Sequence, residues 1–308
     1  MTGEGRFTIK FRGVRGGYPM PGPTTVRYGG NTTCFEVRAG PHLIIVDVGT
    51  GGIELGREMV AHHQETGEPI RATLLLTHLH HDHTQGLPFF RPFLHPKAKL
   101  SIFGAKPGRE NTLEKALIHD IQPPVFPLGL EELYSQREIH HIRGGDRIVL
   151  IDPAEPPSLV SVHDELSELP PHAVVVRVHH GYHHPEEGVL MFRIQYRERS
   201  LVIATDTEGY FNTDRRLIKF ARGTDLLIHD AEYDEHDYAD QMPIRQGWGH
   251  STWRMAVEVA QAAEVKQLVL FHHSPAHSDD YLDEMLVRAQ AVFAETIMAQ
   301  EGGVVSLL

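Results

Sequence analysis

The stretch T-H-L-H-H-D-H, Thr77 to His83, decides the fold. It follows the apolar run Ala72 to Leu76, whose length and composition predict a buried strand. Four side chains with metal-ligand atoms leave that strand in a tight loop: His78, His80, Asp82 and His83. At this spacing they can be shared between two neighbouring cations. The alternative, a polar loop with incidental histidines, requires four ligand-type side chains to coincide directly after a strand.

The histidine count stands out in the composition of the chain. The 308 residues include 23 histidines and a single cysteine, Cys34, so no intrachain disulfide is possible and a metal site must use nitrogen and oxygen ligands. Hydrophobic residues make up 41% and charged residues 23%, which is ordinary for a globular protein. The formal charge of −12 disfavours long nucleic acids as partners, while a metal pair would still attract small anions.

The apolar pattern predicts a mixed α/β chain, which we interpret as one domain over residues 1–308. Strands are expected at Phe7–Phe11, Thr33–Val37, Leu43–Val48, Ala72–Leu76, Leu100–Phe103, Ala173–Val178, Val189–Tyr196, Leu201–Ala204, Leu226–Ile228 and Gln267–Phe271. Helices are expected at Ile53–His62, Asn111–Ile121, Asp214–Ala221, Thr252–Ala263 and Tyr281–Gln300. Gly16–Gly30, Pro123–Gly129 and Ile151–Pro171 are expected to be loops, the last being acidic and either a surface loop or a lid.

The amino-terminal segment Met1 to Arg12 lacks the basic start and apolar stretch of a secretory signal. No other run approaches membrane-spanning length. We therefore expect a cytoplasmic protein with no membrane partner.

The motif H-x-H-x-D-H resembles that of the metallo-β-lactamase superfamily, which His78, His80, Asp82 and His83 match residue for residue. The resemblance implies an α/β fold, a four-layer αβ/βα sandwich of two mixed sheets with outer helices and the metals at one edge. I-V-D-V-G-T-G-G, Ile45 to Gly52, looks like the strand and glycine turn that precede the metal loop in that family. Asp47 would then have a structural role.

The resemblance also implies further ligands in chain order. The His-Pro pair in H-H-P-E-E-G makes His184 the preferred third histidine, with the neighbours His179, His180 and His183 left open. Asp206 follows an apolar strand at the place of the bridging aspartate, and His272 matches the last ligand, with His273 as the competing choice. The implied cofactors are two divalent ions, Zn²⁺ by default with Mn²⁺ or Fe²⁺ possible: His78, His80 and His184 hold one, Asp82, His83 and His272 hold the other, and Asp206 lies between them.

Two segments resemble the ribonuclease Z and cyclic-nucleotide phosphodiesterase branch: I-H-D-A-E-Y from Ile228, and G-W-G-H-S-T ending at Thr252. Carried over by position, His250 would contact a phosphate oxygen or protonate the leaving alkoxide, and Asp230 would hold its ring. The alternative is that Ser251 or Thr252 merely caps a helix.

The opening of that branch also resembles G-V-R-G-G-Y-P-M-P-G, which begins at Gly13. In this region Arg15, Arg27 and Asn31 are candidates for orienting a phosphate at the rim of the site. A glycine-rich turn with scattered arginines is the alternative.

These features predict a binuclear metal-dependent phosphodiesterase with Asp82, His250 and Asp230 as catalytic residues. A metal-bound hydroxide would attack a small phosphodiester such as a cyclic nucleotide or cyclic oligonucleotide. The alternatives are a lactone, thioester or lactam hydrolase on the same fold, a tRNA 3′-processing endonuclease, and a non-enzymatic metal-binding module. The tRNA alternative is disfavoured because the chain has no obvious long basic arm and is strongly negative. A homodimer is implied by the resemblance alone.

Overall fold

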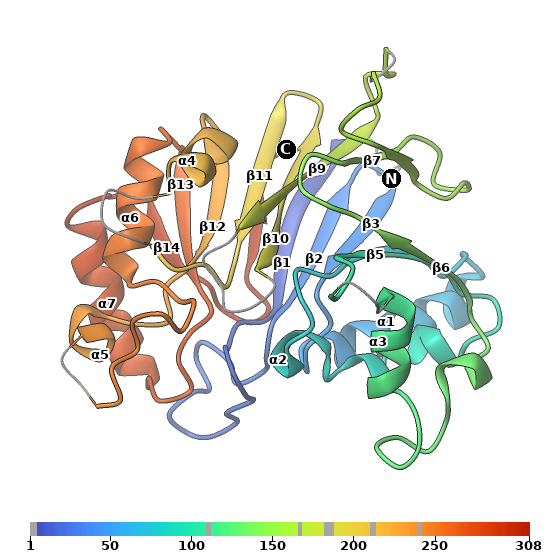
Figure 1. The fold of residues 1–308 in the computed structure, drawn as a ribbon, viewed down its shortest axis with the longest axis horizontal. Helices are drawn as coiled ribbons and strands as arrows, with labels where there is room; N and C mark the ends of the chain where they lie inside the picture. The colour runs from blue at the N-terminus through green and yellow to red at the C-terminus, as the bar shows by residue number, and fades with distance from the viewer. Residues whose placement is uncertain (1–4, 109–111, 166–167, 182–187, 210–213, 240–241) are drawn as a thin grey trace.

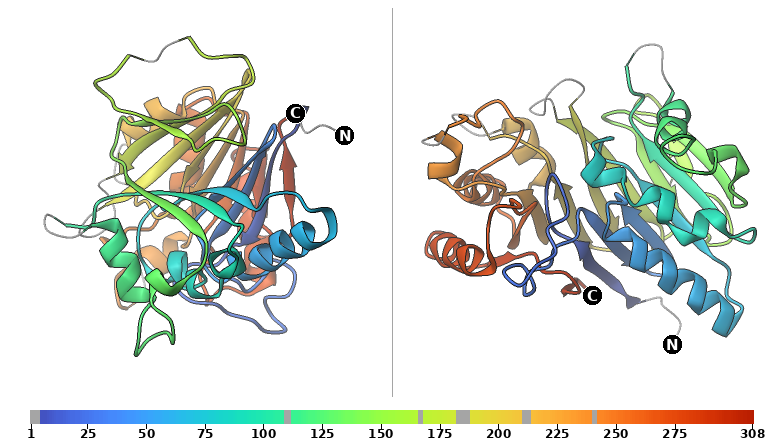
Figure 2. Two further views of the ribbon diagram at one scale, coloured as in Figure 1. Left: turned by 90° about the vertical axis from the view of Figure 1, so that its right-hand side faces the viewer. Right: turned by 90° about the horizontal axis from the view of Figure 1, so that it is seen from below.

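The computed structural model describes residues 5–108, 112–165, 168–181, 188–209, 214–239 and 242–308. It contains two β-sheets packed face to face, with helices on their outer sides (Figures 1 and 2). The expected fold class, two mixed sheets with flanking helices, is confirmed.

The first sheet has the strand order β15-β1-β2-β3-β4-β5-β6. Its strands are β1 (Phe7–Gly13), β2 (Cys34–Ala39), β3 (His42–Val46), β4 (Arg71–Leu75), β5 (Lys99–Gly104), β6 (Gln136–His141) and β15 (Val304–Ser306). The second sheet has the order β14-β13-β12-β11-β10-β9-β7-β8. Its strands are β7 (Arg147–Leu150), β8 (Ser158–Val160), β9 (Val174–Gly181), β10 (Val189–Tyr196), β11 (Arg199–Ala204), β12 (Leu226–Asp230), β13 (Gln267–Phe271) and β14 (Thr296–Met298).

The helices are α1 (Gly52–Thr66), α2 (His81–Thr84), α3 (Leu113–Asp120), α4 (Arg215–Ala221), α5 (Glu235–Ala239), α6 (Trp253–Ala262) and α7 (Asp279–Gln290). Figure 1 shows α1 and α3 outside the first sheet and α4, α6 and α7 outside the second. In α6, the residues Trp253, Ala256, Val257 and Ala260 are buried, and this helical spacing forms one apolar stripe against the sheet. Across the described ranges, no helix is both long and apolar enough to cross a bilayer.

An apolar core fills the space between the two sheets. Strands β1 to β3 contribute to it from one side, and β9 to β11 from the other. Side-chain alternation along each strand produces this core: Val174, Val176 and Val178 of β9 are buried in it, whereas Arg177 between them is exposed.

Parallel strands place the candidate site at one edge of the sandwich. Strands β3 to β6 run parallel in the first sheet, and β11 to β14 run parallel in the second. Loops that carry polar side chains follow the carboxyl ends of β4, β11, β12 and β13. The backbone N–H of Leu190 donates to the carbonyl of Thr77 over 2.8 Å, which ties β10 to the metal loop.

The expected helix from Tyr281 to Gln300 is wrong in its second half. The helix α7 ends at Gln290, and β14 follows at Thr296–Met298. Strand β14 pairs in parallel with Leu268–Leu270 of β13, so sheet pairing outweighs a helical pattern that continues locally. The expected loop from Ile151 to Pro171 likewise contains the short strand β8.

Candidate active site

The metal loop is anchored by Asp47, directly after β3. Its carboxylate accepts hydrogen bonds from the backbone N–H of Thr77 (2.8 Å) and from the Thr77 hydroxyl (2.7 Å). The same carboxylate lies 2.8 Å from Nδ1 of His83. Asp47 therefore fixes both the start of the loop and the ring of one candidate ligand.

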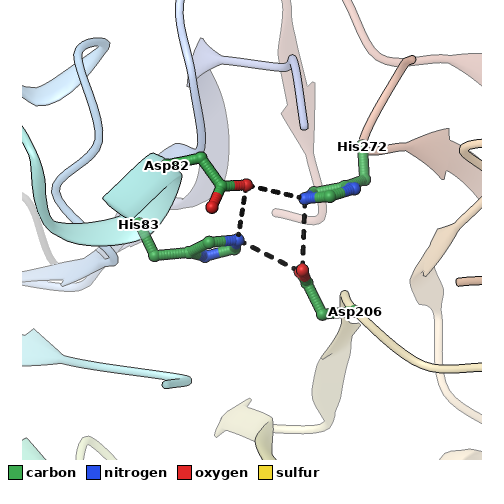
Figure 3. A group of neighbouring side chains, drawn as sticks. All are labelled: Asp82, His83, Asp206 and His272. Carbon is green, nitrogen blue, oxygen red and sulfur yellow. Dashed lines mark hydrogen bonds and ion pairs between the residues drawn. The ribbon is translucent and has the colours of Figure 1, made fainter. Parts of the chain in front are cut away.

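Four side chains point toward one another at the edge between the sheets: Asp82, His83, Asp206 and His272 (Figure 3). Their ligand atoms all lie within 4.8 Å of one another. Nε2 of His272 is 3.2 Å from a carboxylate oxygen of Asp82 and 3.2 Å from one of Asp206. Asp82 and His83 belong to α2, whereas Asp206 and His272 follow β11 and β13, so the cluster joins the two sheets.

The donor set of this cluster fits a cation. Nε2 of His83 is fully buried without a hydrogen-bond partner, yet it lies 3.3 Å from Asp82 and 3.2 Å from Asp206. If Nδ1 carries the proton toward Asp47, the Nε2 lone pair faces two carboxylates, an arrangement that a positive ion between them stabilises.

The electrostatics of the cluster point the same way. Burial opposes charge on His83, but Asp206, Asp82 and Asp47 outweigh it and raise the pKa of His83 well above its usual range. Burial also opposes ionisation of Asp82, but His83 and His272 hold the pKa of Asp82 below its usual range. A positive charge among these carboxylates is therefore favourable. His/Asp clusters of this kind are able to hold metal ions.

The other two histidines of the motif lie beside this cluster. Nε2 of His78 is 3.7 Å from a carboxylate oxygen of Asp206. Its ring centroid lies 4.4 Å from that of His80 and 4.2 Å from that of His83. The motif residues are therefore brought together, and His80 is the one that is exposed to solvent.

The preferred third histidine, His184, lies outside the described residues, as does His183. His179 stacks on Phe220 at 5.0 Å on the outer side of the second sheet. His180 is the next residue on β9, so alternation turns it toward the first sheet. The choice of third histidine stays a prediction.

His250 stands next to the cluster, and two carboxylates face its ring. Nδ1 of His250 lies 2.8 Å from Oδ2 of Asp230 and 3.4 Å from Oε2 of Glu232. The ring stacks on His272 with centroids 4.9 Å apart and planes inclined by 14°. Burial opposes charge on His250, but Glu232 and Asp230 raise its pKa to about 9.

The loop that carries His250 is bonded at several points. The backbone N–H of Ser251 donates to Asp230 over 2.9 Å, and the Ser251 hydroxyl donates to the carbonyl of Thr207 over 2.5 Å. Thr252 caps α6 by accepting from the N–H of Met255. The H-S-T segment therefore caps a helix and also holds a histidine at the cluster.

Sequence reasoning missed Glu232 and Gly17. Oε2 of Glu232 lies 3.1 Å from Nδ1 of His272, so it faces both His272 and His250. The backbone N–H of Gly17 donates to Oδ2 of Asp82 over 2.8 Å. Glu232 belongs to the I-H-D-A-E-Y segment and offered a signal, whereas a backbone donor has none in the sequence.

The proposed phosphate-orienting residues have other partners. Arg15 is fully buried and donates to the carbonyls of Gly29, Ser274 and His277. Arg27 pairs with carboxylates of α7, and Asn31 bonds to Glu301. These contacts favour the alternative of a glycine-rich turn held by its side chains, and a phosphate-orienting role for the three residues stays a prediction.

The competing last ligand, His273, turns away from the cluster. Nε2 of His273 lies 2.8 Å from the carbonyl of Ala299, and its ring packs edge-on against Tyr28. Burial lowers the pKa of His273 to about 3, so it is neutral.

Sequence comparison relates the chain to ribonuclease Z proteins. Ribonuclease Z of Halalkalibacterium halodurans is 29% identical over 252 residues, covering 74% of this chain and 78% of that protein. Ribonuclease Z of Brevibacillus brevis is 35% identical over 113 residues, covering 35% of this chain and 33% of that protein, so this match spans about a third of the relative.

Solved structures share the fold at low sequence identity. A diphosphatase from the PhnP family superposes with a TM-score of 0.63 at 16% identity, covering 98% of each chain. Human tRNase Z, short form, superposes with a TM-score of 0.60 at 21% identity, covering 98% of this chain and 99% of that chain. The Beta-lactamase superfamily domain matches residues 42–273. With the two-sheet sandwich and the His/Asp cluster at its edge, this match shows that the chain belongs to the beta-lactamase superfamily, as a metallo-β-lactamase-type hydrolase.

Proposed function

We propose that this hydrolase is a binuclear metal-dependent phosphodiesterase that acts on a small phosphodiester such as a cyclic nucleotide. The observation that carries the proposal is the position of His250. It is bonded to Asp230 over 2.8 Å and stacked on His272, a member of the metal-type cluster, which is the group of Asp82, His83, Asp206 and His272. An alkoxide leaves a phosphodiester readily only once it is protonated, so a positioned histidine beside the metals suits this chemistry. Asp82, His250 and Asp230 are the proposed catalytic residues.

The proposed ligands are the motif residues and their partners from the second sheet. His78, His80 and a third histidine, preferably His184, would hold one ion, and Asp82, His83 and His272 would hold the other. Asp206 would lie between them. Two bound divalent ions, Zn²⁺ by preference, supply Lewis acidity and an activated water for hydrolysis.

The chain's own residues then orient and move protons. Asp230 accepts from Nδ1 of His250, which leaves Nε2 as the atom that donates to a phosphate oxygen or to the leaving group. Asp47 holds the ring of His83 through Nδ1, so Nε2 faces the cluster. Gly17 holds the carboxylate of Asp82 through a backbone N–H.

Ribonuclease Z relatives make tRNA 3′ processing the second candidate. The match to the Halalkalibacterium halodurans protein covers 252 residues, and ribonuclease action also cleaves phosphodiester bonds. The net charge of −12 favours the smaller substrate, because affinity for a long polyanion depends on clustered cations. A lactone, thioester or lactam hydrolase on the same fold is the remaining alternative. A cytoplasmic location and a homodimer stay predictions.

Hydrolysis assays test the reaction class. Metal-loaded and chelator-stripped protein would be compared on cyclic mononucleotides, cyclic dinucleotides, a precursor tRNA and a chromogenic bis-aryl phosphate. We expect metal-dependent turnover of phosphodiesters. Turnover of lactones or thioesters by loaded protein that leaves every phosphodiester intact would contradict the proposal.

A variant series separates metal binding from proton transfer. His80→Ala and Asp206→Ala should lose metal and activity together. His250→Ala should retain metal, measured by elemental analysis, and lose turnover of an unactivated phosphodiester by roughly 10²- to 10⁴-fold. His62→Ala, an exposed histidine on α1, is the matched control and should change neither quantity. A near-normal rate for His250→Ala would remove its role as the acid.

A further inference from the structure

A row of three arginines crosses the outer face of the second sheet. Arg177 of β9 pairs in register with Arg147 of β7 on one side and with Arg193 of β10 on the other. Strand neighbours lie about 4.8 Å apart and point to the same face. Because Val176 and Val178 face the core, the three arginines face outward. Like charges side by side on a sheet are unfavourable, so this row requires compensating groups.

The two outer arginines of the row are compensated by backbone carbonyls. Arg147 donates to the carbonyls of Ser161 and Asp164. Arg193 donates to the carbonyl of Phe220 over 2.8 Å and to that of Arg222 over 3.1 Å, at the end of α4. The central Arg177 is exposed, and among the described residues no carboxylate is bonded to it.

Arg177 and Arg193 line a hollow with a volume of about 510 Å³, which α4 borders with Arg216 and Lys219. The stacked rings of His179 and Phe220 also line it. The described lining includes four cationic side chains and no carboxylate. Asp214 acts on His179 and Asp225 acts on Arg193 from beside the hollow, so part of this charge is balanced. The exposed side chains of Arg177 and Lys219 still favour an anion there.

Strand β10 connects this hollow to the candidate active site. Leu190, near the start of β10, is bonded to Thr77 of the metal loop. Arg193 lies three residues further along the strand, roughly 10 Å at about 3.3 Å per residue. A phosphodiester chain that runs from the metal loop along β10 has to span about this distance to place another phosphate over the hollow.

We propose that this hollow binds a backbone phosphate of an oligonucleotide. A guanidinium fork matches phosphate geometry, and the exposed Arg177 beside Lys219 in an open hollow fits a phosphate of a strand better than a single buried ion. As a statement about substrate, this rests on the proposed phosphodiesterase and narrows it: among small phosphodiesters, a short or cyclic oligonucleotide, which carries phosphates beyond the scissile one, is preferred to a cyclic mononucleotide. The binding itself does not depend on turnover.

Binding of a short, fluorescently labelled phosphorothioate RNA to the metal-loaded protein tests the hollow. We expect Arg177→Glu to raise Kd at least about tenfold, and Arg177→Gln to have a smaller effect in the same direction. The slope of log Kd against log salt should fall by about 0.7 for each phosphate that is no longer neutralised by a cationic side chain. Arg57→Glu, an exposed arginine of α1, is the matched control and should leave Kd unchanged. Equal Kd for the wild type and both Arg177 variants would overturn the proposal.

Two further measurements distinguish binding of an RNA strand from binding of single phosphates, and failure of this proposal from failure of the proposed function. Millimolar inorganic phosphate should compete only weakly with the RNA; displacement as effective as that by unlabelled RNA would mean that the hollow takes single phosphates and would overturn the assignment to a strand. Turnover of the bis-aryl phosphate should be the same in Arg177→Glu and the wild type, while oligonucleotide turnover falls. If no phosphodiester is hydrolysed by any variant, the proposed function fails, and the Kd comparison still decides whether the hollow binds RNA.

Discussion

Asp47 acts on the metal-type cluster without contributing a ligand atom to it. Its carboxylate accepts three hydrogen bonds at once, from the backbone and hydroxyl of Thr77 and from Nδ1 of His83. Asp47 also has a φ of 58°, in the left-handed region that residues other than glycine seldom occupy. A position with this geometry persists because the surrounding bonds determine it.

We expect Asp47→Ala to weaken metal binding by about 10- to 100-fold, because His83 loses the partner that orients its ring. Calorimetric titration of chelator-stripped protein with Zn²⁺ measures the effect, and circular dichroism checks that the fold is kept. Glu65→Gln, an exposed change on α1, serves as the control. A folded Asp47→Ala protein with unchanged affinity would show that His83 needs no orienting partner.

Single residues of the site could be predicted from the sequence where several ligand-type side chains lie close together in the chain. The motif of His78, His80, Asp82 and His83 stands out because ligand types rarely cluster directly after a strand. The second carboxylate facing His250, Glu232, was not singled out, since its role depends on the packing of β12 beside β13. The positive φ values of Asp206 (53°) and His272 (64°) were not predicted either, because the modest preference of Asp and His for this region does not single out these two positions.

The loop that carries His250 is held in place by the buried carboxylate of Glu208. Glu208, in the segment after β11, accepts from the N–H of Gly247 (2.8 Å), from the N–H of Gly249 (2.9 Å) and from the hydroxyl of Tyr238 (2.6 Å). Its exposed fraction is 1%, so the carboxylate that accepts these bonds is itself shielded from water. Glu208 therefore sets the path of the loop that leads to His250.

Glu208→Gln should lower kcat for phosphodiester hydrolysis by about tenfold or more without loss of metal, because an amide cannot accept from all three donors and the loop shifts. Steady-state kinetics and metal content measured on the same sample check this. Glu258→Gln, an exposed change on α6, should behave as wild type. If kcat for Glu208→Gln equals that of the wild type, the loop does not depend on this carboxylate.

All the expected strands exist, but the structure also has strands that were not expected: β6, β7, β8, β14 and β15. Each of the ten expected strands overlaps an observed one, because buried β-branched runs are a strong local signal. The end of α7 was misjudged because Thr296–Met298 continues an apolar pattern that suits a helix or a strand. Its pairing with β13, a contact distant in sequence, decides the outcome. The short strands β8 and β15 also depend on partners that local sequence does not reveal.

At the scale of the whole molecule, overall charge was a poor guide to local charge. The total of −12 disfavours long nucleic acids as partners, yet the register of β7, β9 and β10 gathers arginines on one face. Composition counts residues, whereas partner choice depends on where the fold puts them. The order of strands in the two sheets could likewise be expected only through the family resemblance.

Metal removal should weaken the packing of the two sheets against each other. Asp82 and His83 follow the first sheet, Asp206 and His272 follow the second, and the carboxylates of the cluster are buried, so bound cations both cross-link the halves and cancel repulsion. A ligand that binds only the folded state raises the free energy of unfolding by about 2.7 kcal/mol when its free concentration is about a hundred times its Kd. We therefore expect calorimetric scans of metal-loaded protein to give a Tm several degrees above that of chelator-stripped protein, rising with free Zn²⁺. Asp206→Ala should lose this dependence, while Glu65→Gln should keep it. Identical Tm values for loaded and stripped wild-type protein, with metal content verified, would mean that the cluster does not couple metal binding to folding.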